Sequence, residues 1–407
     1  MSIAHEEITL RWDPGRATLG GRRSRQPVRY RAYLPAPIAD LDPLVSSSAL
    51  NSITDAEAAC SRLEVTEGMV RVNLETVARQ LLRAESVASS RIEGLIVSHR
   101  RLAKAAFTDG QGDFAAQSVL RNISGLEQAL KLATEVERID RETIVSIHEA
   151  MFGGTADDRH AGVVRDRQSW IGRDGSTPAT ADFVPPPADA VNPLLDDLGA
   201  FASRNDVSAV LQAAIVHAHF ETIHPFWDGN GRVGRALIHV VLRRRGAIAR
   251  FLPPVSLVLA NNADAYVRGL TSYRFADEND WYVLFSDALR VSADGSTAFA
   301  ERIRTLQEHW REQAGNPRRD SAASRLIELL PSHPVVNLRT AMELTGASDE
   351  AVLRAFERLQ STGVIRQTTV GKRNRAFESI GLFALMDEFE RELGPADRTP
   401  VASQRPT

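Results

Sequence analysis

Apolar residues recur at helical spacing along most of this chain. Between residues 75 and 93 five apolar residues fall on one helix face: Val77, Leu81, Ala84, Ala88 and Ile92. Gly94 follows as a helix stop. The same spacing predicts helices over 102–107, 114–136, 141–151 and 294–313, with Trp281 and Phe285 in the core of another. The pattern predicts a mainly α-helical protein.

Two further apolar runs flank a polar stretch that begins at His224 and ends at Arg235. Asp228-Gly229-Asn230-Gly231 is a turn signal, so we expect a tight loop that opens a helix. A helix N-terminus presents N–H groups and the positive end of the helix dipole, which favours anions. Gly229 and Gly231 would let the backbone come close to such an anion.

The charged residues of this stretch suit a polyphosphate. Arg232 and Arg235 are three apart and share a helix face, where two guanidiniums fit a polyphosphate better than a single carboxylate. Asp228 is a hard oxygen ligand for a phosphate-bound magnesium ion. His224 lies at the mouth of the loop and can take a proton near neutral pH.

These residues resemble the signature of the Fic family, His-x-Phe-x-Asp/Glu-Gly-Asn-Gly-Arg-x-x-Arg, at all eight constrained positions. The alternative is a Gly-Asn turn beside surface arginines. The resemblance implies transfer of AMP from ATP to a Ser, Thr or Tyr hydroxyl of a target protein, self-modification included. It implies His224 as the base, Phe226 as an anchor, and Asp228 as the Mg²⁺ ligand. It also implies an anion hole formed by Gly229, Asn230 and Gly231. Arg232 and Arg235 would bind the outer phosphates.

Ser89-x-x-x-Glu93-Gly94, at the end of the helix predicted over 75–93, resembles the Fic inhibitory motif. That resemblance implies that Glu93 pairs with Arg235 and inhibits the enzyme. The alternative is a solvent-facing glutamate at a frayed helix end, where the dipole disfavours an acid.

Short β-type runs between residues 162 and 187, with Asp174-Gly175 as a turn, predict a hairpin. Its place before the signature resembles the Fic flap, which holds the target segment by main-chain hydrogen bonds. Ile171 and Gly172 would lie nearest the substrate, unless this is a plain surface hairpin. By the same resemblance, Asn262 and Tyr266 are candidates to close over the adenine.

Residues 320–393 are expected to form a separate unit. Helices at Ala322–Leu330 and Leu338–Leu344, a third helix capped by Ser348, and a strand–turn–strand over 363–377 resemble a winged helix. The wing residues could hold phosphates: Lys372, Arg373 and Arg375. Asp349 and Glu350 would repel phosphates where base-reading residues normally lie. A DNA partner and a protein-interaction or dimerisation role both stay open.

The expected domains are an N-terminal helical region with the inhibitory helix (1–110), a Fic catalytic core with a β-hairpin flap (111–314), the winged-helix-like domain (320–393) and a disordered tail (394–407). Residues 1 to about 45 look irregular and rich in arginine, which indicates a solvated arm more than a nucleic-acid arm. The clustered arginines are Arg16, Arg22, Arg23, Arg25, Arg29 and Arg31.

The chain has 407 residues, 43% of them apolar and 25% charged, with a net charge of −3. These are the values of a soluble globular protein, and they imply no general attraction to nucleic acid or membrane. Cys60 is the only cysteine, which excludes an internal disulfide and fits a reducing cytoplasm. The N-terminus lacks the features of a signal peptide, and no apolar run reaches the roughly 18 residues of a membrane span. We therefore expect a cytoplasmic protein.

Three other functions remain open at this point. The first is the same fold with another nucleotide-like donor, such as a phosphocholine carrier, although the arginine pair favours ATP. The second is removal of AMP, with Glu93 orienting a water molecule. The third is a DNA-binding regulator in which the Fic unit mainly senses nucleotide. The oligomeric state, homodimer or other, is also open.

Overall fold

The computed structural model describes residues 4–13, 27–65, 74–107, 113–154, 158–172, 177–370 and 374–394. Helices dominate these residues, together with two small antiparallel sheets, so the predicted mainly helical fold is confirmed. The chain divides into two compact units. The first unit is formed from residues 1–55, 124–247 and 267–286, and the second from residues 56–123, 248–266 and 287–407.

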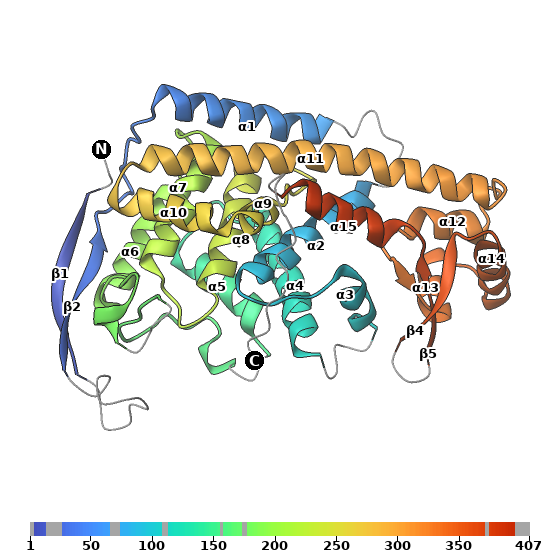
Figure 1. The fold of residues 1–407 in the computed structure, drawn as a ribbon, viewed down its shortest axis with the longest axis horizontal. Coiled ribbons are helices and arrows are strands. Elements are labelled where there is room, and N and C mark those ends of the chain that lie inside the picture. The colour runs from blue at the N-terminus through green and yellow to red at the C-terminus, as the bar shows by residue number, and fades with distance from the viewer. Residues whose placement is uncertain are drawn as a thin grey trace, which may run out of the picture. The chain divides into compact units, whose positions relative to one another are not determined.

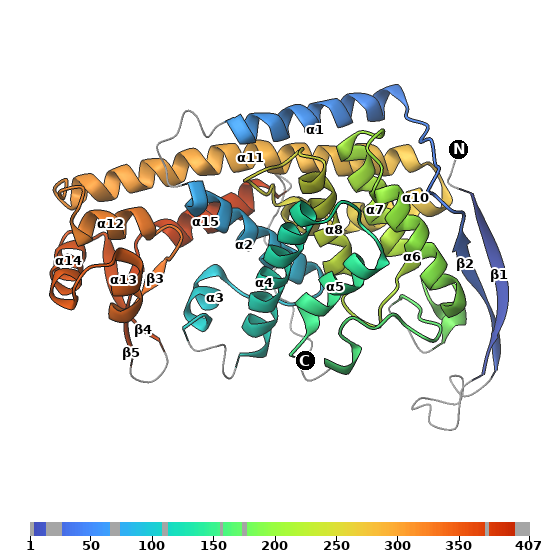
Figure 2. The same ribbon diagram turned by 180° about the vertical axis from the view of Figure 1, so that it is seen from behind.

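The first unit begins with two strands, β1 (His5–Trp12) and β2 (Val28–Pro35), which pair antiparallel and run side by side (Figure 1, Figure 2). The expectation of an irregular segment before residue 45 is therefore wrong for these residues. Arg29 and Arg31 are exposed, whereas Tyr30 and Ala32, which alternate with them, are buried. This alternation is that of a strand with one covered face. The other clustered arginines lie outside the described residues.

Buried helices form the core of the first unit. Its helices include α5 (Arg141–Phe152), α6 (Ala188–Ala202), α7 (Ala209–Ile223) and α8 (Asn230–Arg244). Every residue of α7 from Val210 onward is buried, and α8 lies beside it (Figure 1, Figure 2). A helix covered on all sides is a rigid support for the residues that follow it. The loop between α7 and α8 is the polar stretch singled out in the sequence.

The second unit contains α2 (Leu74–Ile92), α3 (His99–Ala105) and α9 (Val255–Asn261). Four helices contribute residues to both units: α1 (Ser47–Val65), α4 (Phe114–Glu135), α10 (Ala263–Phe275) and α11 (Glu278–Gln313). The sequence suggested separate helices around Trp281 and over 294–313, but α11 is a single helix. Gly295 lies inside this helix, at a position where a Cβ atom would meet the Leu393 side chain at 2.5 Å.

The C-terminal part of the second unit has the order helix, strand, helix, helix, strand, strand, helix. Its elements are α12 (Ala322–Leu329), β3 (Val335–Val336), α13 (Leu338–Thr345), α14 (Asp349–Ser361), β4 (Ile365–Val370), β5 (Asn374–Ser379) and α15 (Leu382–Glu392). The three strands form an antiparallel sheet in the order β3-β5-β4. Ser348 caps α14, as predicted, with its side chain accepting from the Ala351 N–H. The strand β3 and the helix α15 were not predicted.

Several sequence features fall outside the described residues. Lys372 and Arg373 of the predicted wing lie there, as do the Asp174-Gly175 turn and the predicted tail beyond Gly394. Within the ranges that the structure does describe, no helix combines the length and apolar character that crossing a membrane requires.

Candidate active site

The loop between α7 and α8 starts with a backbone turn at His224. This residue has φ 49° and ψ 62°, a left-handed conformation that residues other than glycine rarely adopt. Its N–H still donates to the Phe220 carbonyl, at 2.9 Å, and so ends α7. The chain therefore leaves the buried helix at a fixed angle, with the imidazole at the start of the loop.

Asn230 closes the loop on itself. Its Oδ1 accepts from the Phe226 N–H and its Nδ2 donates to the Phe226 carbonyl, both at 2.8 Å. The Phe226 ring is fully buried and stacks on His148, with ring centroids 3.8 Å apart. Because the Asn230 amide is used inside the loop, only the backbone N–H of this residue is directed to the start of α8.

Gly229 caps α8 with φ 80°, and a Cβ atom on it would meet the Phe152 ring at 2.1 Å. Both its conformation and its surroundings therefore require glycine. Because α8 begins at Asn230, the N–H groups of Asn230 and Gly231 have no acceptor within the helix. This is the backbone arrangement that binds phosphate at helix N-termini.

Arg232 and Asp228 lie together at this helix start. The Arg232 guanidinium stacks over the Phe152 ring at 4.2 Å, and its Nη2 is 3.4 Å from Asp228 Oδ2. The other carboxylate oxygen of Asp228 accepts from the Gly229 N–H at 2.7 Å. The Asp228 side chain is 81% exposed, so it can reach a ligand outside the loop. Arg235, one turn along α8, is almost fully buried.

The residues around Asp228 bear on metal binding. In the part of the chain that the structure describes, no group of three or more His, Cys, Asp or Glu side chains could hold a metal ion. Magnesium bound to a nucleotide usually takes only one or two protein carboxylates and keeps phosphate and water ligands. A single exposed carboxylate beside a phosphate-binding helix start therefore fits Mg²⁺ carried by a nucleotide, and does not fit a protein-only metal centre.

His148 of α5 holds the loop between α7 and α8 through hydrogen bonds of its two ring nitrogens. Its Nδ1 accepts from the Gly162 N–H at 2.9 Å, so its Nε2 carries the proton and donates to the Asp228 carbonyl at 3.0 Å. The ring lies between Phe152 and Phe226 and stacks on both. Burial lowers the pKa of His148 to about 4, so the ring stays neutral at pH 7. His148 thus holds the signature loop in place.

The His224 imidazole is half-buried and faces two cations. Burial, with smaller contributions from the Arg274 and Arg165 guanidiniums, lowers the pKa of His224 to about 3, and the Glu221 backbone acts in the opposite direction. The imidazole is neutral at pH 7 and able to accept a proton. Arg165 and Arg274 were not singled out in the sequence, because neither belongs to the signature or to a recognisable motif.

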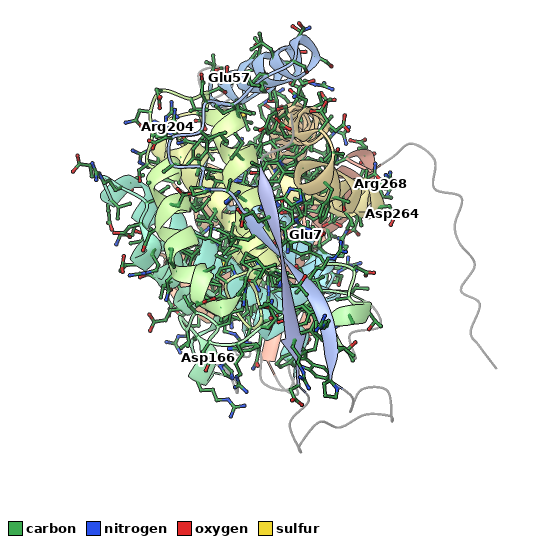
Figure 3. The ribbon with its side chains drawn as sticks, turned by 90° about the vertical axis from the view of Figure 1, so that its left-hand side faces the viewer. Glu7, Glu57, Asp166, Arg204, Asp264 and Arg268 are labelled. Atoms are coloured by element: carbon green, nitrogen blue, oxygen red, sulfur yellow. The ribbon has the colours of Figure 1, made fainter. Side chains whose placement is uncertain are left out.

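The segment that precedes α6 and includes Val164 and Ile171 pairs both with itself and with the loop between α7 and α8. Ile171 exchanges two hydrogen bonds with Phe183, at 2.8 and 3.0 Å, and Val164 bridges Phe226. The predicted hairpin is thus present as antiparallel pairing, but its flanks form isolated bridges and not the predicted β-runs. Asp166, labelled in Figure 3, lies between these bridges with a side chain that is 76% exposed. Gly172 has φ 154° and packs against the Asp182 backbone.

Ser89, Glu93 and Gly94 lie in the second unit. The helix predicted over 75–93 is present as α2, and Gly94 ends it with φ 82°. The Gly94 N–H donates to the Arg91 carbonyl and the Leu95 N–H to the Ser90 carbonyl, both at 2.9 Å, which is a Schellman ending. Glu93 is exposed just past this end, whereas Ser89 is buried.

The two candidates for an adenine pocket also lie in the second unit. Asn262 is exposed at the end of α9, and its Oδ1 accepts from the Ala265 N–H at 3.4 Å. Tyr266 is buried, and its N–H donates to the Asn262 carbonyl. The first unit alone therefore brings together His224, Asp228, the glycine turn and the two arginines.

The fold and the site together define a class of protein: mainly helical, with a loop suited to phosphate between two buried helices. Residues 138–242 match the Fic/DOC family, and residues 50–131 match the N-terminal domain of that family. Over these two regions the chain is thus similar to the Fic/DOC family.

Known relatives match parts of the chain. It is 30% identical over 150 residues to protein adenylyltransferase fic-1 of Caenorhabditis elegans, covering 35% of this chain and 27% of that protein. It is 30% identical over 182 residues to a probable protein adenylyltransferase of Aquifex aeolicus, covering 44% of this chain and 53% of that protein. The chain thus spans between about a quarter and about half the length of these two relatives.

A solved structure extends the likeness to the fold. The crystal structure of a Fic family protein from Desulfovibrio desulfuricans G20 is 21% identical, with a TM-score of 0.53. The match covers 83% of this chain and 98% of that one, so the two proteins share a fold over most of their length.

Proposed function

We propose that this protein is an adenylyltransferase that moves AMP from ATP to a Ser, Thr or Tyr hydroxyl of a target protein. The observation that carries the proposal is the junction of α7 and α8. A neutral histidine, a glycine turn that requires glycine, an exposed carboxylate and two arginines follow one another within it. The names of the relatives, protein adenylyltransferases, support the same activity.

His224 would act as the general base. The target hydroxyl oxygen attacks the α-phosphorus of ATP, and its proton passes to the neutral imidazole. The bond from the α-phosphorus to the bridging oxygen breaks in line, and pyrophosphate leaves with the electron pair. The low pKa of His224 keeps it unprotonated before the reaction. The negative charge of a bound nucleotide would raise that pKa toward neutrality, which makes the imidazole a better base.

The phosphates would lie at the start of α8. The backbone N–H groups of Asn230 and Gly231 would hold phosphate oxygens, and that of Gly229 would join them once it leaves Asp228 Oδ1. Arg232 and Arg235 would bind the outer phosphates. Asp228 would hold Mg²⁺, which when bound neutralises charge on the phosphates and the leaving group. The side chain of Asn230 would contribute indirectly, because its amide is already paired with Phe226.

The target segment would add to the flap by main-chain hydrogen bonds. Both backbone groups of Ile171 are used in its pair with Phe183. Neighbouring residues of an antiparallel strand direct their backbone groups to the opposite side. Gly172 is therefore better suited than Ile171 to pair with a target segment, and Ile171 would set the position of that edge.

Glu93 would inhibit the enzyme by pairing with Arg235, in the way that the family resemblance implies. The positive φ of Gly94 and the exposed position of Glu93 beyond α2 are compatible with an acid that reaches outward. Such a pair would occupy a guanidinium that the γ-phosphate of ATP needs. ATP would then bind with its α-phosphate misplaced for in-line attack.

The C-terminal part of the second unit would act as a winged-helix-like interaction module, because its element order and sheet match that arrangement. Its helix α14 opens with two exposed acids, Asp349 and Glu350, and carries Leu353 with 43% exposure. Acids repel phosphates, and an exposed leucine suits an apolar contact. These features favour a protein partner over DNA.

Label transfer tests the proposal. The protein is incubated with a heat-inactivated cell lysate, in which kinases no longer transfer the γ-phosphate, and with ATP labelled at either the α- or the γ-phosphate. Glu93→Gly should incorporate the α-label strongly and the γ-label not at all, because pyrophosphate leaves. Glu135→Gly is a matched control, since it also removes an exposed glutamate at the end of a helix, α4, and should stay at the wild-type level.

The base assignment has its own variant. His224→Ala in the Glu93→Gly background should slow transfer by at least about 100-fold, with ATP affinity changed by less than about tenfold. Incorporation of the γ-label, or no α-label with any variant, would contradict adenylyl transfer. Equal α-label incorporation by wild type and Glu93→Gly would contradict the inhibitory role alone.

A further inference from the structure

Arg165 is a buried arginine beside the signature loop, with 2% of its surface exposed. Among the residues that the structure describes, its guanidinium donates only to main-chain carbonyls. Nε bonds the His224 carbonyl at 2.8 Å, Nη1 the Arg167 carbonyl at 3.0 Å, and Nη2 the Pro186 and Ile223 carbonyls at 2.6 and 3.3 Å. The Arg165 N–H also donates to the Pro225 carbonyl at 2.9 Å. One residue thus binds three consecutive carbonyls, those of Ile223, His224 and Pro225.

These carbonyls need partners for two reasons. The last carbonyls of a helix have no intrahelical donor, and they form the negative end of the helix dipole. His224 also holds a left-handed backbone conformation, which costs roughly 1–2 kcal/mol for a residue with a side chain. Without a restraint on its carbonyl, this turn would relax and the imidazole would change direction.

A second guanidinium binds the same helix end from α10. Arg274 Nη2 donates to the Glu221 carbonyl at 3.2 Å and its Nε to Thr222 Oγ1 at 3.0 Å. Its guanidinium lies over the Phe183 ring at 4.0 Å. Arg165 and Arg274 are the charged groups that lower the pKa of His224, so they also favour its neutral form.

We propose that Arg165 is a positioning residue for His224: its planar guanidinium fixes the carbonyls on both sides of the left-handed turn and thereby aims the imidazole. A planar fork of five N–H donors can satisfy four carbonyls at once, whereas a lysine ammonium has three donors at a single point. Burial lowers the pKa of Arg165 to about 10, so the guanidinium stays charged at pH 7. The role therefore depends on shape as well as charge. Its consequence for catalysis rests on the proposed function.

Arg165→Lys separates shape from charge, and Arg244→Lys is the matched control. Arg244 also donates to main-chain carbonyls of the first unit, those of Glu137, Ala202, Ser203 and Arg204. It lies in the last turn of α8, away from the signature loop. Two quantities are measured in the full-length protein: hydrogen exchange of the backbone over residues 222–229, and AMP transfer in the Glu93→Gly background.

Arg165→Lys should speed exchange over 222–229 by at least about tenfold, because the turn loses its restraint. It should lower kcat by about 100-fold while KM for ATP changes by less than about threefold, because the phosphate-binding start of α8 is untouched. Arg244→Lys should change neither. Exchange and kcat at wild-type values in Arg165→Lys would refute the proposal.

A measurement on the unmutated side chain keeps the proposal testable if Arg165→Lys does not fold. In the wild-type protein the guanidinium protons of Arg165 should exchange at least about tenfold more slowly than those of Arg167, whose side chain is 81% exposed. Equal exchange at the two arginines would contradict the proposal that the Arg165 guanidinium holds the turn at His224. If no variant transfers AMP, the proposed function fails, and the two exchange measurements still decide whether Arg165 holds the turn.

Discussion

Gly229 separates the loop of His224 from α8 and has no room for a side chain. Its φ of 80° and the Phe152 ring, 2.1 Å from where a Cβ would lie, exclude alanine for two independent reasons. The same ring carries the Arg232 guanidinium on its face and stacks on His148. A single aromatic residue of α5 thus sets the shape of the turn and the position of one arginine.

Gly229→Ala should reduce stability by about 2–4 kcal/mol, from the cost of a positive φ together with the clash on Phe152. Gly246→Ala is the control, because Gly246 also has a positive φ, 67°, but nothing lies within 4 Å of its Cβ position. Urea unfolding of both variants measures the difference. Equal losses would mean that the Phe152 contact contributes nothing.

The sequence predicted the members of the signature loop but not the residues that hold them. Spacing and residue type indicated an anion site from Asp228 to Arg235. No pattern marked Arg165, because its partners are backbone carbonyls and these leave no trace in sequence. His148 lies on an apolar helix face, where a histidine that packs and one that fixes a catalytic loop look alike.

Helix α15 brings the ends of three other helices together through one residue. The Glu390 carboxylate accepts from Arg91 in the last turn of α2 and from His99 at the start of α3, the latter at 2.7 Å. Its carbonyl accepts from the Asn261 side chain at the end of α9, at 3.1 Å. Burial alone would raise the pKa of Glu390, but the hydrogen bond with His99 and the charge of Arg91 outweigh it and lower the pKa to about 2.

Glu390→Gln should lower the stability of the second unit by about 2 kcal/mol, because the buried His99 and the half-buried Arg91 lose a charged acceptor. Glu392→Gln is the control, since Glu392 pairs with Arg302 at a half-exposed site on the same helix and such pairs contribute about 0–1 kcal/mol. Thermal unfolding compares the two variants. A larger loss for Glu392→Gln would contradict the role given to Glu390.

Helices were predictable because their period of 3.6 residues stands out in the sequence, as α2 and α4 illustrate. The strands were harder. In β2 the alternation of Arg29 and Arg31 with Tyr30 and Ala32 was masked by the abundance of arginine nearby. In the flap the β-type residues around Val164 and Ile171 form only single bridges, because their partners come from the signature loop and from Phe183.

At the scale of the molecule, five histidines in the described part of the chain have low pKa values chiefly because they are buried. The pKa is about 3 for His217, His219 and His224, and about 4 for His148 and His333. An unfolded histidine takes up a proton near pH 6.5, whereas these folded ones do not. The unfolded chain then binds more protons, so stability falls as the pH drops from about 6.5 to about 4.

We therefore expect the free energy of unfolding to fall between pH 6.5 and 5 by up to about 1 kcal/mol per pH unit for each of these histidines. Carboxylates such as Glu390 act in the same direction only below about pH 4.5. Urea unfolding at several pH values measures the slope. His219→Asn should flatten it by the share of one histidine, and a profile that is level over this range would contradict the assignment.

The division of the chain into two units has a consequence for how such a protein evolves. Each unit is assembled from three separate stretches of sequence. A recombination breakpoint anywhere between residues 56 and 286 would leave parts of both units on each side. The first and the last stretch, 1–55 and 287–407, each belong wholly to one unit, but their boundaries fall inside α1 and α11. Exchange of segments between related genes would therefore separate parts of both units or split a helix, whereas point substitution leaves the division of the chain intact.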